Sequence, residues 1–404
     1  MNDNPSWPVS RRSAGSRAPG GTRRVLAVDA ARGLALVGLT AIHFLPGTDQ
    51  STGDPTWSWI LFAGDSAALL ALLAGVGLGL FSGGRTPPRG QRMTGARVGV
   101  AVRALLIFVV GMSLRYLMPA DTSAVNILPY YGVFFLLSVP FLHLPPRKLL
   151  IGAGGLALLS PVLILGLRAQ LPAYTSSNPT FADLFLSPAA TIAQFLITGT
   201  YPALAYLTYL LTGLALGRLD LRRCQVRTGV LVAGVGLALL ARLISWILLH
   251  VLGGYEQLRQ DVPSGSREEL ERILVFGPDT TFVVSSWWLV VTTPHANTPL
   301  AIASSLGAGL IVLGSFLLLT PRAGAWLLPL SSIGVMTLTL YSAQLVLPSF
   351  GVHDDRPVLW FTIYLTAAVV FALIWQRIFG QGPLERLVSM TARGASIRIA
   401  SAPR

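Results

Sequence analysis

The sequence predicts an all-α membrane protein, a polytopic bundle of about ten transmembrane helices. Three observations predict this class. Of the 404 residues, 52% are hydrophobic and only 12% are charged, about half the charged share of a soluble globular chain. The mean hydropathy is +0.63. Apolar runs of about 20 residues recur along the whole chain, and each can cross about 30 Å of hydrocarbon at 1.5 Å per residue.

The apolar runs divide the chain into ten predicted spans. In chain order these spans cover residues 25–45, 57–82, 98–118, 124–143, 149–167, 192–217, 228–251, 299–320, 324–348 and 357–378. The glycines at 75–79 predict close helix packing. The polar break at 198–202 predicts a cavity wall, since broken helices in membranes line cavities, although packing alone also explains it. The run at 280–292 is too short to cross, so it predicts an interfacial or re-entrant segment.

The charges predict the sidedness of the bundle. Basic residues precede the first span and fill the even-numbered connections, whereas most acidic residues lie in the odd-numbered ones. Because cytoplasmic loops carry the excess of Lys and Arg, we expect both termini in the cytoplasm and the protein in a bacterial-type inner (plasma) membrane. The same pattern accounts for the net charge of +13, so the expected partner is the lipid bilayer and not a nucleic acid.

The chain divides into three predicted segments. Residues 1–22 are polar, basic and rich in Pro, Gly and Ser, which predicts a disordered cytoplasmic tail. Residues 23–380 form the multipass transmembrane domain. Residues 381–404 are a cytoplasmic tail whose start, 381–394, is predicted to be a short amphipathic helix on the cytoplasmic face.

The first span carries ionisable residues, which are costly in hydrocarbon and count as candidate functional groups. Asp29 and Arg32 are one helical turn apart and can pair; neutralisation near the headgroups is the simpler explanation. His43 is eleven residues beyond Arg32, which places it about 20° away around the helix and roughly 16 Å further along. One stripe therefore carries a cation near the inner surface and an imidazole near the outer surface.

Asp65 in the second span is a candidate partner for His43. It lies about 12 Å inward from Trp57 at the outer end, and the short connection makes the first two spans antiparallel neighbours. A carboxylate on one imidazole nitrogen leaves the other free as a base or nucleophile. We therefore expect a catalytic pair of His43 and Asp65; the alternative is that Asp65 only caps or pairs within the bundle.

Five further residues are candidates for substrate binding. Asn126, Tyr130 and Tyr131 open the fourth span with an amide and two phenols, which suits a sugar or acyl-acceptor site or, equally, an aromatic belt. Arg242 lies mid-way along the seventh span and must face a partner or water. His295 lies in an outer loop and is also a second catalytic candidate. The sequence has no His/Asp/Glu cluster with metal-ligand spacing, and its single cysteine, Cys224, excludes a Cys-based cage, so no metal is expected.

Several of these residues lie in stretches that resemble a known family. The opening Arg24–Gly38 with its Asp-x-x-Arg-Gly motif, followed by His43, resembles the start of the transmembrane acyltransferase superfamily, and above all bacterial relatives of heparan-alpha-glucosaminide N-acetyltransferase. The stretches 126–132, 201–220 and 293–299 are similar to the same group. The stretch 380–385 resembles a related bacterial membrane family of unknown function. Together these stretches run through nearly all of the membrane region.

The resemblance implies ten or eleven membrane helices and a specific chemistry. In this family acyl-coenzyme A binds from the cytoplasm, and a membrane histidine helps to pass the acyl group to an acceptor on the far side. Asp29 and Arg32 match the family opening, and His43 matches by neighbourhood. We expect acyl-CoA (acetyl-CoA) to dock against Asp29, Arg32, Arg97 and Arg103, His43 and Asp65 to catalyse transfer, and a cell-envelope sugar or glycolipid to accept the acyl group.

Two other functions fit the sequence. A transporter or lipid-handling protein without chemistry also needs intramembrane charges and broken spans, and it should ignore acyl-CoA. A structural membrane subunit would tolerate apolar residues at Asp65 and Arg242.

Overall fold

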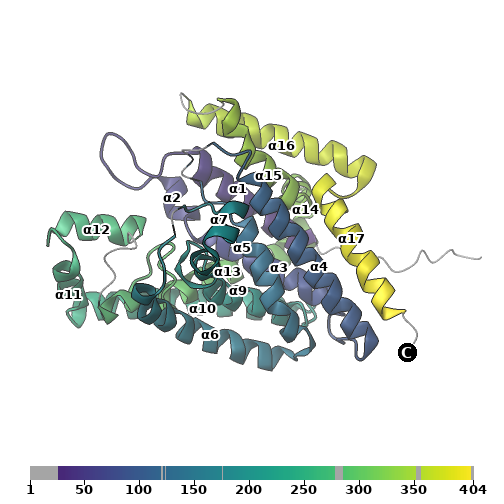
Figure 1. The fold of residues 1–404 in the computed structure, drawn as a ribbon, viewed down its shortest axis with the longest axis horizontal. Helices are drawn as coiled ribbons and strands as arrows, with labels where there is room; N and C mark the ends of the chain where they lie inside the picture. The colour runs from purple at the N-terminus through teal and green to yellow at the C-terminus, as the bar shows by residue number, and fades with distance from the viewer. Residues whose placement is uncertain are drawn as a thin grey trace, which may run out of the picture.

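The computed structural model describes residues 26–401 apart from 120, 121, 123, 175, 278–284 and 352–355. These residues form an all-helical bundle (Figure 1), and the only β pairing among them is an isolated bridge between Thr48 and Pro55. The predicted tail 1–22 lies outside the described residues. The all-α prediction is therefore confirmed for the described part of the chain.

The first third of the chain supplies four helices. They are α1 (Leu26–Phe44), α2 (Trp57–Phe62), α3 (Asp65–Phe81) and α4 (Gln91–Leu114). The second predicted span is broken, because the chain turns at Ala63 and Gly64, where Gly64 adopts a φ of 75°. Glycine reaches this left-handed region without the penalty of a Cβ atom. The break makes Asp65 the first residue of α3.

The middle third contains shorter and more irregular helices. They are α5 (Leu128–Ser138) with η1 (Val139–His143), α6 (Pro146–Leu167) with η2 (Arg168–Gln170), α7 (Phe181–Leu186), α8 (Pro188–Ala193) with η3 (Gln194–Thr198), α9 (Ala203–Leu216), and α10 (Cys224–Trp246) with η4 (Ile247–Val251). The predicted break at 198–202 separates η3 from α9. The predicted sixth span is therefore two helical pieces.

A small layer covers one end of the bundle between α10 and α13. It consists of α11 (Gly254–Asp261), α12 (Arg267–Phe276) and η5 (Ser286–Val290), and Figure 1 shows α11 and α12 projecting from the bundle. These helices share a second apolar cluster that includes Leu258, Leu270 and Trp288. Residues 280–284 of the expected interfacial segment lie outside the described residues; in the rest, Trp288 is 2% exposed.

The last third completes the bundle. It contains α13 (Pro299–Ala323), α14 (Leu328–Val335), α15 (Thr337–Val346) with η6 (Leu347–Phe350), α16 (Pro357–Phe379) and α17 (Pro383–Ala400). The axis bends by 77° between α14 and the segment that begins with α15. The predicted ninth span, 324–348, is therefore also broken.

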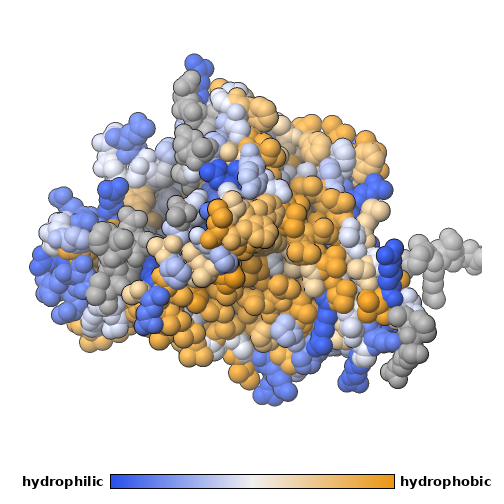
Figure 2. Space-filling model, in the orientation of Figure 1, coloured by the Kyte–Doolittle hydropathy of each residue, from blue (hydrophilic) through white to orange (hydrophobic). Residues whose placement is uncertain are grey.

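Seven helical segments of the described chain are long and apolar enough to span a membrane, or eight if the bent α14–α15 pair is one span. The apolar segments at 128–143 and 203–216 are shorter. All ten predicted spans are helical, but length and composition support seven or eight, so the count of ten stays a prediction, as does the sidedness. In Figure 2 apolar side chains cover the middle of the face, and hydrophilic side chains gather over α11 and α12.

Glycines set the closest helix contacts. A Cβ atom on Gly334 of α14 would overlap the carbonyl oxygen of Asp29 in α1, and one on Gly213 of α9 would overlap that of Leu72 in α3. Small residues at membrane helix interfaces let backbones approach in this way. The polar residues of α1 and α3 are therefore held by tight backbone packing.

The C-terminal helix α17 is longer than the predicted 381–394 segment and packs lengthwise on α4 (Figure 1). Gly95 and Gly99 of α4 lie against Ser396 and Ala392 of α17. Val388 is buried at the same contact, whereas Leu387 is exposed. This helix thus forms part of the bundle and brings its side chains next to those of α4.

Candidate active site

The pair formed by Asp29 and Arg32 lies on α1 as the sequence predicts. Arg32 Nη1 is 3.0 Å from Asp29 Oδ1, and the two side chains are only 26% and 11% exposed. Arg32 Nη2 also donates a hydrogen bond of 3.1 Å to the carbonyl oxygen of Leu73 in α3. A guanidinium in such surroundings must be paired and hydrogen-bonded to stay charged. Its position is therefore fixed from two helices.

Arg103 extends this charged region from α4. The charges that act on it are those of Arg32, Glu385 and Arg393, and its guanidinium carbon lies 5.6 Å from the centroid of the Phe135 ring. Glu385 and Arg393 belong to α17, so the C-terminal helix contributes to the region. We call these five residues (Asp29, Arg32, Arg103, Glu385 and Arg393) the basic cluster; it has three cations and two anions.

Glu385 also fixes the start of α15. Its carboxylate accepts hydrogen bonds from the backbone N–H of Thr339 at 3.0 Å and from Thr339 Oγ1 at 2.5 Å. Carboxylates are favourable at helix N-termini, where N–H groups lack helical partners. One of the two anions of the basic cluster is therefore already engaged by a helix end.

Arg97, the fourth residue predicted to bind coenzyme A, has a different environment. Its Nη2 lies 3.2 Å from Nδ1 of His143 at the end of η1. Arg97 is not among the charges that act on Arg103. The structure therefore places three of the four predicted residues in the basic cluster and Arg97 beside His143.

His43 lies near the other end of α1, held by an amide. Nδ1 of His43 is 3.2 Å from Nε2 of Gln344 in α15, and Oγ1 of Thr40 donates a hydrogen bond of 2.5 Å to Oε1 of Gln344. The ring of Tyr341 is 6.1 Å away between centroids. If the amide N–H donates to Nδ1, the proton of a neutral ring is on Nε2.

The structure gives Asp65 partners other than the expected His43. The carboxyl group of Asp65 is acted on by the hydroxyl of Ser305 in α13 through a hydrogen bond and by the charge of Arg242. The adjacent Ser66 faces Gly38 of α1 instead. Because successive helical residues point about 100° apart, α3 turns Ser66 toward α1 and Asp65 toward α13. The histidine takes its partner from α15.

Arg242 connects α10 to α13. Its Nε donates a hydrogen bond of 3.1 Å to Oγ of Ser304. It belongs to the lining of neither cavity described below. The sequence predicts that Arg242 faces a partner or water, and the structure gives it Ser304 as a hydrogen-bond partner and Asp65 as a carboxyl group on which its charge acts.

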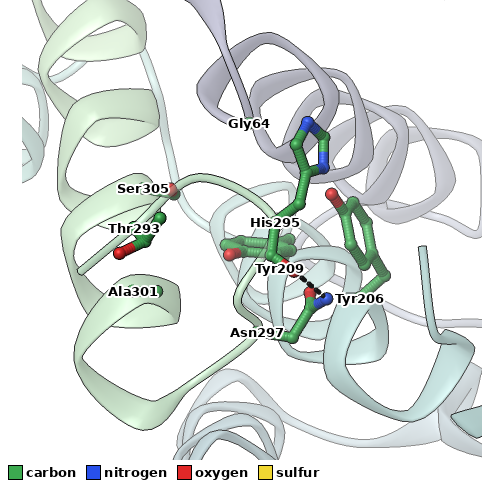
Figure 3. Close-up of a pocket in the computed structure, with 8 residues that line it drawn as sticks. All are labelled: Gly64, Tyr206, Tyr209, Thr293, His295, Asn297, Ala301 and Ser305. Atoms are coloured by element: carbon green, nitrogen blue, oxygen red, sulfur yellow. Dashed lines mark hydrogen bonds between the residues drawn. The ribbon is translucent and has the colours of Figure 1, made fainter. Parts of the chain in front are cut away.

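His295 lies in the loop between η5 and α13 in a strained backbone conformation. His295 and Asn297 have φ values of 58° and 52° and are the only described residues other than glycine with positive φ. Such conformations cluster at functional sites. Asn297 Nδ2 donates a hydrogen bond of 2.8 Å to the carbonyl oxygen of His295, which is drawn in Figure 3. Burial lowers the pKa of His295 to about 4, so the imidazole is neutral at pH 7.

Two cavities meet at His295. The smaller, of about 10 Å³, is lined by Gly64, Tyr206, Tyr209, Thr293, His295, Asn297, Ala301 and Ser305 (Figure 3) and has room for about one water molecule. We call it the polar pocket. The larger, of about 160 Å³, lies among α6, the break at 198–202 and η5, and also includes His295. Nδ1 of His295 is buried without a hydrogen-bond partner.

Two tyrosines connect the histidines. The Tyr201 ring is 5.6 Å from that of His295, Tyr201 is among the groups that act electrostatically on Tyr341, and Tyr341 neighbours His43. Tyr131 is acted on by both tyrosines and by Arg32, and its hydroxyl is buried without a partner. Tyr131 therefore lies between the basic cluster and the tyrosines that connect the histidines.

Asn126 and Tyr130 support the backbone and the aromatic core. The Asn126 amide donates to the carbonyl oxygen of Gly111 at 2.9 Å and accepts from the N–H of Leu128 at 3.0 Å, which orders the start of α5. The Tyr130 ring is fully buried and packs edge-on against Phe195 and Tyr201. Of the three residues Asn126, Tyr130 and Tyr131, it is Tyr131 that the structure brings toward the other candidate residues.

Three residues of the candidate site were not predicted from the sequence: Gln344, Glu385 and Arg393. Gln344 was detectable, because an amide inside an apolar span needs partners as a charge does. Glu385 lies in the stretch 380–385 that resembles a bacterial membrane family, but nothing in the sequence of this segment, predicted to lie on the membrane surface, indicates that Glu385 and Arg393 reach α4. Among the described residues, no three His, Cys, Asp or Glu side chains are grouped so as to hold a metal ion.

Comparison with known sequences identifies the family. The sequence model of the catalytic region of heparan-alpha-glucosaminide N-acetyltransferase matches residues 24–250. The chain belongs to this family. No curated protein matches the sequence. The heparan-alpha-glucosaminide N-acetyltransferase match covers α1 to α10, and therefore Asp29, Arg32, His43, Asp65 and Arg103.

Five other residues of the candidate site lie beyond the region of the family match. Gln344, Glu385, Arg393, Ser305 and His295 come from segments that follow residue 250. The structure nevertheless places each of them against residues of the matched region. The candidate site of this member of the heparan-alpha-glucosaminide N-acetyltransferase family is thus built from both parts of the chain.

Proposed function

We propose that this protein transfers an acyl group from acyl-CoA, with acetyl-CoA as the simplest donor, to an acceptor on the opposite side of a bacterial inner membrane. The acceptor is a hydroxyl- or amine-bearing sugar or glycolipid of the cell envelope. One observation carries the proposal. The basic cluster and His43 lie toward opposite ends of the same helix, α1, with Tyr131 acted on by both Arg32 and Tyr341.

The basic cluster suits an anionic donor. Its three guanidinium groups outnumber its two carboxylates, and Glu385 is already hydrogen-bonded to Thr339. Guanidinium groups form strong bidentate hydrogen bonds with phosphate. We propose that Arg32, Arg103 and Arg393 hold phosphate groups of the coenzyme on the cytoplasmic side, with Asp29 keeping Arg32 in place. Arg97 is available to a more peripheral phosphate.

His43 is the proposed base. The acceptor loses a proton to His43 as its oxygen or nitrogen attacks the thioester carbonyl carbon; the new C–O or C–N bond forms and the C–S bond breaks. The proton then passes from His43 to the coenzyme A thiolate. In an alternative order, His43 itself carries the acyl group. Gln344 orients the ring, and Asp65 interacts with Ser305, which lines the polar pocket.

The test is coenzyme A release by purified protein in detergent supplied with acetyl-CoA. Parent protein should release free thiol, and His43→Ala should lose this release while it elutes as a monodisperse peak. His250→Ala is the matched control, because His250 is exposed and stacks only on Trp246 and Tyr255. Full release by His43→Ala contradicts the role of His43.

The rival function is transport without chemistry, which the bent α14–α15 segment favours because transporters use discontinuous helices at their binding sites. A transporter should bind and move a substrate with no dependence on acyl-CoA. Absence of thiol release from parent protein at every acyl chain length, together with uptake that depends on Asp65, would favour transport.

A further inference from the structure

The cavity of about 160 Å³ beside His295 has no role in the donor chemistry described above. Its lining joins the last turns of α6, the break at 198–202 and the segment from Trp288 to Thr298. The volume is more than ten times that needed for one water molecule. We call it the acceptor-side cavity, because it lies at the end of the bundle at which α1 and α6 end and includes His295.

One part of the wall of the acceptor-side cavity is apolar. Apolar side chains come from three elements, and they are Ile164, Leu165, Ile197, Leu289 and Val291. The opposite surface of α6 exposes Leu158, Leu159, Val162 and Leu163, the pattern of a helix that faces lipid. One helix therefore separates the cavity from the bilayer. A molecule with an apolar chain fits such a wall better than a fully polar sugar does.

Among the described residues of the lining, Arg168 provides the only charged side chain. No carboxylate of the described residues forms a salt bridge with it; its electrostatic neighbour is the phenol of Tyr174. Other arginines of this end do interact with carboxylates: Arg115 acts on Asp183, and Arg259 forms a salt bridge with Glu256. A half-buried guanidinium without a carboxylate is suited to bind an anionic ligand.

Two buried polar atoms in the same lining lack partners. They are Oγ1 of Thr198 and Nδ1 of His295. Buried polar groups in native proteins are almost always hydrogen-bonded, and an exception needs a ligand, a water molecule or a function. Both atoms belong to residues of the acceptor-side cavity, so a bound hydroxyl-bearing molecule can satisfy them.

We propose that the acceptor-side cavity binds an anionic amphiphile, with its phosphate or carboxylate on Arg168, its apolar chain along α6 and Leu289, and a hydroxyl toward Thr198 and His295. The assignment of this molecule as the acyl acceptor rests on the proposed function; its binding does not. The acceptor class is thereby narrowed from any envelope sugar to a lipid-linked or alkyl-bearing anion.

The experiment is calorimetric titration of the purified full-length protein in nanodiscs with hexyl phosphate. Inorganic phosphate and hexyl glucoside are titrated in parallel, since they supply the anion alone and the alkyl chain alone. Parent protein should bind hexyl phosphate saturably and at least tenfold more tightly than either comparison compound. Equal binding of inorganic phosphate or of hexyl glucoside overturns the proposal.

Arg168→Gln should raise the Kd for hexyl phosphate at least tenfold, because it removes a charge-assisted hydrogen bond. Arg168→Lys keeps the charge and should stay within about threefold of the parent. Arg272→Gln is the matched control, because this exposed arginine on α12 lies outside the cavity lining. An unchanged Kd in a folded Arg168→Gln protein contradicts the proposal, and so does lost binding in Arg272→Gln.

Thiol release from acetyl-CoA is measured on the same preparations. Hexyl phosphate binding that depends on Arg168 supports the site even if the parent shows no thiol release, in which case only the proposed enzymatic function fails. Thiol release by a parent that does not bind hexyl phosphate leaves the enzymatic function intact and overturns the site.

Discussion

The two polar regions of this bundle differ in how their charges are neutralised. The basic cluster holds three arginines against two carboxylates and so keeps an excess of positive charge. The region around His43 and His295 contains imidazoles, phenols, hydroxyls and an amide, with Asp65 and Arg242 as its charges. The first arrangement is suited to hold an anion, and the second to move a proton. The difference implies that substitutions in the two regions should change different kinetic constants.

The largest expected effect is a loss of turnover in the histidine region. His43→Gln should lower kcat at least 100-fold, about 3 kcal/mol of transition-state stabilisation, and leave the KM for acetyl-CoA within about twofold. Steady-state kinetics of thiol release separate the two constants. Parallel losses in kcat and affinity would show that His43 also holds the donor and would break the division between the regions.

The second-largest effect is expected from a substitution at the contact between α1 and α14, which supports both regions. Gly334→Ala should destabilise the protein by about 1–3 kcal/mol, because the new methyl group overlaps the Asp29 carbonyl and the helices must separate. Gly154→Ala is the matched control, since no atom lies within 4 Å of a Cβ atom there. Thermal unfolding in detergent compares the two variants. Equal midpoints would contradict the packing argument.

The third effect tests the neutral state of His295. Its folded pKa of about 4 lies below the unfolded value of about 6.5, so the unfolded chain binds a proton first as the pH falls. The contribution of neutral His295 to the free energy of unfolding is intact above pH 6.5 and is lost as the pH falls from 6.5 to 4. At pH 5 this loss amounts to up to about 2 kcal/mol.

Unfolding midpoints at pH 7 and pH 5 measure this loss. His295→Gln should be less sensitive to acid than the parent, whereas His250→Gln should match the parent. An identical shift in the parent and His295→Gln would place the acid sensitivity elsewhere.

The smallest effect is expected in the basic cluster. Arg103→Gln should raise the KM for acetyl-CoA about tenfold with kcat nearly unchanged, because one of three cations is lost. Arg92→Gln is the control, since Arg92 is exposed at the start of α4 and is not among the charges that act on Arg103. A drop in kcat alone would assign Arg103 to the chemical step and remove the contrast between the regions.

The amino-acid sequence was sufficient to predict the membrane class, the positions of the helices and the pairing of Asp29 with Arg32. These features depend on composition, on runs of apolar residues and on neighbours one turn apart, so no tertiary contact is needed to predict them. It also pointed to the resemblance that the family match confirms. The break at 198–202 was visible because Gly199 and Pro202 stand close together there and favour an interruption of the helix.

Which side chains of distant helices meet depends on the three-dimensional packing of the bundle. His43 pairs with Gln344 and not Asp65, because the break at Gly64 and the 100° step between Asp65 and Ser66 set which residue of α3 faces α1. Arg393 reaches the basic cluster because α17 packs on α4 about 290 positions away in the chain. Such contacts depend on how helices are rotated and bent against one another, and apolar periodicity in a membrane span carries little of that information.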